Sequence, residues 1–163
     1  MANINLPMSA MQKANALTLP EYEVSGDIDY YGFDDALDEG GIWRIGQLPT
    51  LAADDMTVDI DFFATDVTGT VQFGVQALAY NVGTDLTAIT TAAFATAVLS
   101  TATTVDGTTL VPVRATVTLT TGAQQDSAVT GDYFILKVYR DVSGDSLSGD
   151  AEVVAVHLSY PAS

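Results

Sequence analysis

The segment Met56–Phe63 has the sequence MTVDIDFF, in which apolar residues alternate with threonine or aspartate up to Phe62. Successive side chains of a β-strand point to opposite faces of a sheet, so this pattern predicts a strand with one buried side and one solvent-facing side. Several strands of this kind without long helices between them predict an antiparallel sandwich or barrel. Four further segments repeat the alternation: residues 70–79, 111–119, 134–138 and 154–160.

The number of expected strands favours one architecture. Glu21–Tyr30 and Ile42–Ile45 add two strands, which brings the total to about seven or eight, within the range of a jelly roll. We therefore expect one all-β domain, an antiparallel jelly-roll sandwich, over residues 23–163. The last strand should bury one face, formed by Val154, Val156, Leu158 and Tyr160.

One segment departs from the two-residue period. Residues 92–99 have the sequence AAFATAVL, whose alanines favour a helix. The surrounding stretch, residues 86–105, carries no charge, but it is rich in threonine and alanine rather than in the leucine, isoleucine, valine and phenylalanine of membrane spans. We expect a short helical insertion between two strands and no membrane partner.

Residues 1–22 form an apolar, nearly uncharged segment that differs in composition from the rest. Ser9 and Gln12 match a capping box, in which each side chain bonds a free backbone N–H of a helix start. We expect an extended, partly helical N-terminal arm. An apolar arm is unfavourable in water, so it must dock on its own domain or on another subunit. Its candidate interface residues are Leu6, Met8, Met11 and Leu17.

The formal net charge is −16, from 21 acidic and five basic residues. Nucleic-acid binding depends on neutralising phosphates, so we expect no nucleic-acid partner. The chain has no cysteine, which excludes disulfides and cysteine-based metal sites. Met1–Pro7 lacks the basic and apolar regions of a signal peptide, so we expect none, and the absence of cysteine suits a cytoplasmic origin.

Catalytic patterns are missing from the sequence. His157 is the one histidine, and no Gly-x-Ser-x-Gly elbow accompanies it. Asp59 and Asp61 lie on the outward side of one expected strand, which is typical of a solvated face. The segment Asp141–Glu152 has acidic and hydroxyl residues at some positions of a calcium loop, but Ser146 replaces the required glycine, so a plain turn is favoured over a calcium site. We expect no enzyme activity, no metal and no cofactor.

The expected strand at residues 133–140 carries an unusual outward side. Tyr133, Ile135 and Tyr139 lie there beside Lys137, whereas a solvent-facing side is normally more polar. Aromatic residues are enriched at interfaces, so this side is a candidate subunit or capsid interface. The alternative is that the arm or the expected helical insertion covers it.

The order of strands and turns resembles the jelly-roll virion proteins of tailed bacteriophages, over roughly residues 43–160. In the second half, Arg140-Asp141 ends a strand, Gly149-Asp150-Ala151 follows an acidic turn, and the chain closes on Leu158-Ser159-Tyr160. The earlier elements that fit are Trp43, Leu48-Pro49, Met56–Phe63 and Gly69–Phe73.

This resemblance implies a virion structural protein that binds the outside of a capsid as cement or decoration. It also implies the major capsid protein as partner and a homotrimeric state. The protein would then be made in the host cytoplasm and located at the capsid surface. The alternative within the same resemblance is a head-fibre or tail-fibre domain that binds a host receptor glycan, with Tyr30, Tyr31 and Phe33 as candidates for a shallow aromatic site.

Overall fold

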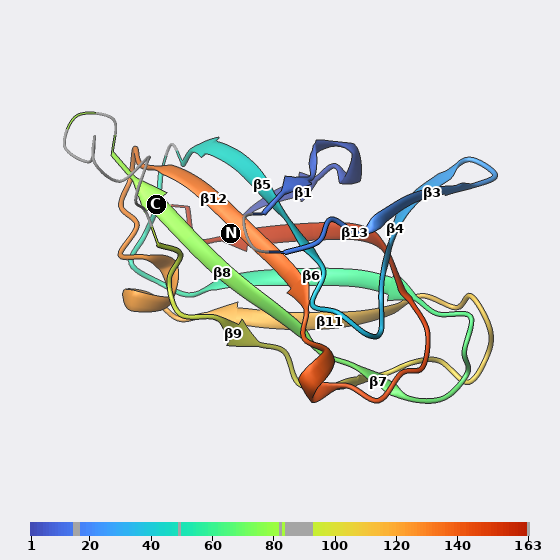
Figure 1. The fold of residues 1–163 in the computed structure, drawn as a ribbon. Coiled ribbons are helices and arrows are strands. Elements are labelled where there is room, and N and C mark those ends of the chain that lie inside the picture. The colour runs from blue at the N-terminus through green and yellow to red at the C-terminus, as the bar shows by residue number, and fades with distance from the viewer. Residues whose placement is uncertain (15–16, 49, 82, 84–92, 163) are drawn as a thin grey trace.

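The computed structural model shows a sandwich of two antiparallel β-sheets (Figure 1). Every strand pair within the sheets is antiparallel. The all-β antiparallel sandwich predicted from the sequence is therefore confirmed. The structure describes residues 1–14, 17–48, 50–81, 83 and 93–162.

The first sheet has six strands, which include the first and the last strand of the chain, β1 and β13. Strand β1 (Ala2–Leu6) and strand β4 lie end to end along the same edge of β13. The order of the other five strands is β11 (Val113–Leu119), β6 (Met56–Phe63), β13 (Ala151–Tyr160), β4 (Ile28–Phe33) and β3 (Glu21–Ser25).

The second sheet has five strands in the order β2 (Gln12–Lys13), β5 (Gly40–Gln47), β12 (Tyr133–Arg140), β8 (Phe73–Tyr80) and β9 (Val98–Leu99). A small ladder joins β7 (Thr70–Val71) to β10 (Thr103–Thr104). Within the described ranges the helices are three-residue 3-10 turns, and none is long and apolar enough to cross a membrane. These turns are η1 (Met8–Ala10), η2 (Ala123–Gln125) and η3 (Val142–Gly144).

The predicted alternation places the core between the sheets. In β6 the even-numbered residues are fully buried, and their neighbours are half-buried. Phe62 of the first sheet meets Phe73 of the second edge to face, with ring centroids 5.2 Å apart. Phe33 meets Phe73 in the same way at 6.1 Å. Such pairs add to the burial of apolar surface that holds the two layers together.

The prediction for the last strand is wrong at one residue. Val156, Leu158 and Tyr160 are buried as expected, but Val153 is buried in place of Val154. The register between β13 and β6 shifts between Val153 and Ala155. A bulge inserts an extra residue and reverses which side chains face the core, which the strict alternation could not anticipate.

The prediction of a separate, partly helical arm is corrected by the structure. Residues 2–13 supply strands to both sheets, and the one helical turn in this segment is η1. Leu6, Met8 and Met11 are buried in the protein's own core. The indole N–H of Trp43 donates a hydrogen bond of 2.9 Å to the carbonyl of Pro7. The segment therefore docks on its own domain, because the sandwich offers it an apolar surface and backbone partners.

The predicted helical insertion is also wrong where the structure describes it. Residues 93–97 have no regular structure, Val98–Leu99 is strand β9, and residue 92 lies outside the described residues. The backbone N–H of Ala95 donates to the carbonyl of Ala77 at 2.8 Å, and the Gln76 amide donates to the carbonyl of Ala95 at 2.8 Å. Hydrogen bonding to the edge of β8 overrides the helix propensity of the alanines.

Candidate ligand-binding face

The outward side of the five-stranded sheet, called here the outer face, collects side chains from three neighbouring strands. Pairing of β12 with β5 and with β8 arranges them in four rows. Along the sheet the rows are Gln47–Tyr133–Tyr80, Arg44–Ile135–Leu78, Ile42–Lys137–Gln76 and Gly40–Tyr139–Gly74.

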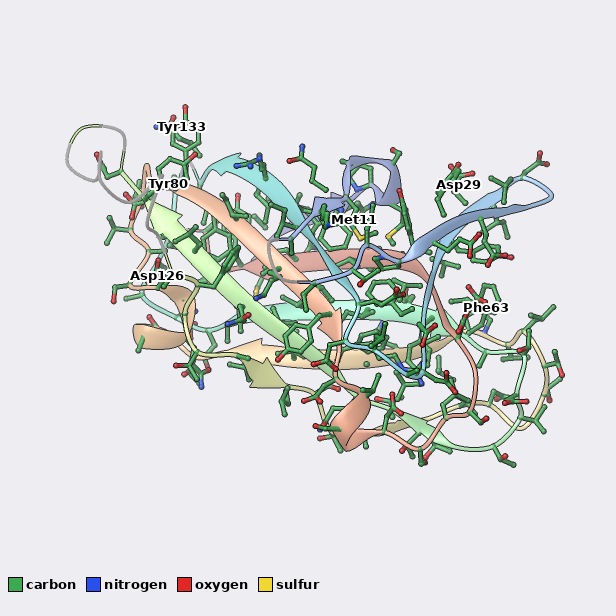
Figure 2. All side chains as sticks on the ribbon, in the orientation of Figure 1. Met11, Asp29, Phe63, Tyr80, Asp126 and Tyr133 are labelled. Carbon is green, nitrogen blue, oxygen red and sulfur yellow. The ribbon has the colours of Figure 1, made fainter. Side chains whose placement is uncertain are left out.

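Aromatic rings occupy both ends of the outer face. Tyr80 and Tyr133 stack with centroids 5.4 Å apart and an interplanar angle of 15°, and Figure 2 shows both at the same end of the sheet. At the other end the ring of Tyr139 lies where a side chain at Gly74 would stand, so this position requires glycine. Burial is the main cause of the raised pKa of Tyr139. Leu17 contacts Gly40 beside this ring.

The middle of the outer face contains two buried apolar side chains. Ile135 and Leu78 lie opposite each other and are only 7% and 9% exposed. The ammonium nitrogen of Lys137 lies 4.9 Å from the ring centroid of Phe94 and 5.7 Å from that of Tyr139. Burial lowers the pKa of Lys137. A cation held between aromatic rings beside an apolar floor is a favourable setting for a polar ligand.

The structure brings together only part of the predicted interface. Tyr133, Ile135 and Tyr139 lie on one face, as expected, and Leu17 approaches it at Gly40. Residues 93–97 border this face along β8. The alternative prediction, that the segment expected to be helical covers this face, is therefore correct in part. The other three predicted residues, Leu6, Met8 and Met11, are in the core.

Three residues of this region were not predicted from the sequence. Tyr80 belongs to the outer face because the alternation of β8 continues to its last residue. Arg44 reaches the face through the pairing of β5 with β12, which only strand order reveals. Phe94 lay in the expected helix, so no signal placed it here.

The alternative aromatic site is not formed. Phe33 is fully buried between the sheets and Tyr31 is 8% exposed. Tyr30 is half-buried, and its hydroxyl donates to Oε2 of Glu23 at 3.1 Å. The prediction of a shallow site from these three residues is therefore wrong, because two of them belong to the core.

The acidic pair on the other sheet is neutralised by its neighbours. The Arg114 guanidinium donates to both carboxylate oxygens of Asp61, at 2.5 and 2.7 Å, and holds the pKa of that carboxyl below its usual range. Asp59 accepts from Thr116 at 2.7 Å. His157 Nε2 lies 3.4 Å from Asp61 Oδ2. The described polar contacts of the His157 ring are with Asn5 and Asp61, and neither partner is a hydroxyl or an amine that the imidazole could activate.

The acidic loop that resembles part of a calcium site pairs with a buried arginine. The fully buried Arg140 donates to Asp145 at 2.6 Å and to the carbonyls of Phe33, Leu147 and Gly149 at 2.7–3.1 Å. Over the described ranges, no three acidic or histidine side chains are arranged to hold a metal ion. Asp145 thus balances a buried cation, as such a cation requires.

A carboxylate cluster surrounds Gly32. Oxygens of Glu152, Asp150 and Glu23 would lie 3.1, 3.4 and 3.5 Å from a side-chain carbon at this glycine. Glu152 is 8% exposed, and its Oε2 has no hydrogen-bond partner. Burial, with the charges of Glu23 and Asp150, raises the pKa of Glu152 to about 7.

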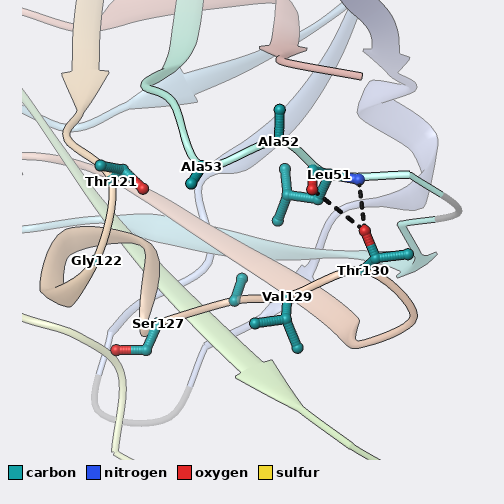
Figure 3. A pocket seen from close by; sticks show the side chains of 9 residues that line it. Leu51, Ala52, Ala53, Thr121, Gly122, Ser127, Val129 and Thr130 are labelled. Atoms are coloured by element: carbon teal, nitrogen blue, oxygen red, sulfur yellow. Dashed lines mark hydrogen bonds between the residues drawn. The ribbon is translucent and has the colours of Figure 1, made fainter. Parts of the chain in front are cut away.

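A groove of about 480 Å³ opens at a loop-bearing end of the sandwich (Figure 3). Its loops are joined where Leu51 N–H donates to the Thr130 hydroxyl at 2.8 Å. The lining holds aliphatic and hydroxyl side chains without a charged or aromatic residue. Because recognition of a specific ligand needs convergent polar or aromatic groups, the outer face is the stronger candidate.

Comparison with known proteins shows the fold. No protein-family model matches the chain, and no curated protein matches it. The solved structure of the xylan-binding module CBM15 is similar, with a TM-score of 0.56 and 12% identity over 99% of this chain and 97% of that chain. CBM35 from Cellvibrio japonicus Abf62 has a TM-score of 0.52 and 8% identity over 97% and 93%. At these identities the likeness establishes a shared jelly-roll-like sandwich.

Proposed function

We propose that this protein is a non-enzymatic jelly-roll domain that binds a glycan on its outer face. The observation that carries the proposal is the aromatic arrangement on that face: Tyr80 stacked on Tyr133 at one end, Tyr139 at the other, and Phe94 at the border. The similar fold of a xylan-binding module supports a saccharide as ligand.

The chemistry of the outer face suits a sugar chain. A sugar ring has an apolar face of C–H groups, which packs favourably against an aromatic ring. Gln47 beside Tyr133 and Gln76 beside Lys137 add amide groups, and Lys137 adds a charged donor. These side chains stand on paired strands, whose backbone is already ordered, so little conformational entropy is lost on binding.

A glycan array tests the proposal. The wild-type protein is expected to bind a defined subset of glycans, and Tyr133→Ala is expected to weaken binding at least tenfold, because a tyrosine contact contributes about 1–3 kcal/mol at such sites. Tyr22→Ala is the matched control, because this 49% exposed tyrosine lies on β3, away from the outer face. Equal losses for both variants, or no binding to any glycan, would refute the proposal.

A second candidate function is attachment to a phage capsid as a decoration or cement protein, and the β3–β4 hairpin favours it. The hairpin projects from the sandwich (Figure 1). Tyr22, Val24 and Ile28 on it are 49%, 55% and 58% exposed. Exposed apolar residues gathered on a projecting element are typical of protein interaction sites. The buried N-terminal segment leaves this hairpin as the better contact with a capsid protein.

Two measurements test the second candidate. Val24→Asp is expected to abolish co-sedimentation with assembled shells while leaving the fold intact, because the residue is exposed. Light scattering is expected to give the mass of a trimer. Full occupancy of the shell by Val24→Asp would show that the hairpin does not contact the capsid protein. A monomeric mass at every concentration would refute the trimer.

A further inference from the structure

The outer face has a charge opposite to that of the protein. The sequence has 21 acidic residues and five basic ones, yet the four rows of this face contain two bases and no acid. The two bases are Arg44 and Lys137. The two bases form a local positive site on an acidic protein, to which an anion is attracted, and the carboxylates of Asp38 and Asp141 act only at the Tyr139 end of the four rows.

These two cations differ from the paired ones elsewhere in the fold. Arg114 is bonded to Asp61, and Arg140 to Asp145. No carboxylate of the described residues lies within 4.0 Å of Arg44 or Lys137. Arg44 donates only to the Gln12 amide oxygen, at 3.0 Å, among its described hydrogen bonds.

The geometry allows one anionic ligand to meet both cations. Arg44 lies opposite Ile135 and Lys137 lies opposite Ile42, so the two basic residues are diagonal neighbours on adjacent strands. Side chains in this relation start about 7–8 Å apart. Arg44 reaches Gln12 on β2, on the side of β5 away from β12, so its guanidinium turns toward β12 when a ligand is shared with Lys137. Lys137 is partly buried, which lowers its pKa, and an anion beside it would favour its charged form.

We propose that the glycan bound by the outer face is acidic and carries uronic-acid carboxylates, one of which is held between Lys137 and Arg44. This inference rests on the proposed function and adds the chemical class of the ligand. The arginine fork donates two parallel hydrogen bonds to a carboxylate, and the ammonium group adds a charged donor. The rings of Phe94 and Tyr139 flank the ammonium group and restrict its position.

Calorimetric titration with two oligosaccharides of equal length tests this inference. Tri-galacturonic acid is the acidic probe, and a neutral galactose trimer is its counterpart. The wild-type protein is expected to bind the acidic trimer at least tenfold more tightly, because a hydrogen bond to a charged group contributes about that factor. Equal or tighter binding of the neutral trimer would overturn the acidic specificity and leave glycan binding in place. Failure to bind both trimers, together with an empty glycan array, would overturn both.

Three variants locate the effect. Lys137→Met keeps the length of the aliphatic side chain and removes its charge. Arg44→Gln removes the charge of an exposed residue, so this substitution should leave the fold intact. Each is expected to weaken binding of the acidic trimer about tenfold and to reduce the preference for the acidic over the neutral trimer. Lys13→Gln is the control, because it removes the same charge from the edge strand β2, outside the four rows. A loss for Lys13→Gln equal to that for the other two would refute the site.

Discussion

Glu152 should make the stability of the protein fall as the pH rises. Its carboxylate is 8% exposed, lies beside Glu23 and Asp150 above Gly32, and has one oxygen without a partner. Ionising this group in the folded state is unfavourable, so its pKa is raised from 4.5 to about 7. Glu152→Gln keeps the shape of the side chain and removes the charge. We expect this variant to be more stable than the wild-type protein at alkaline pH.

The size and pH range of the effect follow from the pKa. Below pH 4.5 the carboxyl is protonated in both the folded and the unfolded state, and its favourable contribution is complete. This contribution is lost as the pH rises to about 7, because the unfolded chain then releases a proton that the folded chain retains. A shift of this size corresponds to about 3 kcal/mol. Solvent screening near the surface reduces the expected gain of Glu152→Gln to about 1–3 kcal/mol above pH 8.

Urea unfolding between pH 4 and pH 9 measures this difference. Glu21→Gln is the control, since it removes the same charge from an exposed position on β3 and should change the free energy of unfolding by less than about 0.5 kcal/mol. Glu152→Gln should match the wild-type protein at pH 4 and exceed it above pH 8. Equal free energies of unfolding for Glu152→Gln and Glu21→Gln above pH 8 would contradict the unfavourable ionisation of Glu152.

Three further substitutions test the packing. Met11→Ala should lower the free energy of unfolding by about 2–5 kcal/mol in urea titration, because Met11 is 7% exposed in the core. An unchanged free energy of unfolding would mean that the N-terminal segment is not packed in the core. Gly74→Ala should destabilise by about 1–3 kcal/mol and alter the near-UV circular dichroism, because the new methyl group displaces the Tyr139 ring; an unchanged spectrum would contradict this contact. Arg140→Met should cost about 3–5 kcal/mol by leaving Asp145 buried and unpaired, and a thermal melt equal to that of the wild type would refute it.

The strands were predictable wherever polar and apolar residues alternate without interruption. Met56–Phe63 is a strand with the predicted ends, and its buried residues are the predicted ones. In β13 the alternation fails at a bulge, because register depends on the neighbouring strand and not on the segment itself.

The N-terminal segment shows the limit of composition. Its apolar residues predicted that it packs against another surface, but not whether that surface belongs to its own domain or to another subunit. The hydrogen bond between Trp43 and Pro7 joins residues 36 positions apart, and no local pattern predicts such a contact. The alanines of residues 93–97 wrongly predicted a helix. Helix propensity is a local property, and hydrogen bonding of this segment to β8, a distant strand, outweighs it.

The candidate site was predictable in one strand only. Tyr133, Ile135 and Tyr139 share a side of β12 because of the two-residue period. Arg44, Tyr80 and the other residues of the outer face come from neighbouring strands, and their position follows from strand order and register. This is why the charge of the face could not be predicted from the sequence.

The most direct test of the central claim is nuclear magnetic resonance mapping of bound glycan on the isotopically labelled protein, with the tightest glycan from the array as probe. The claim predicts that the amide signals of Tyr133–Arg140 and Phe73–Tyr80 shift on titration, while those of β6 and β11 stay unchanged. Shifts confined to the loop groove around Leu51 and Thr130, or to the β3–β4 hairpin, would contradict it.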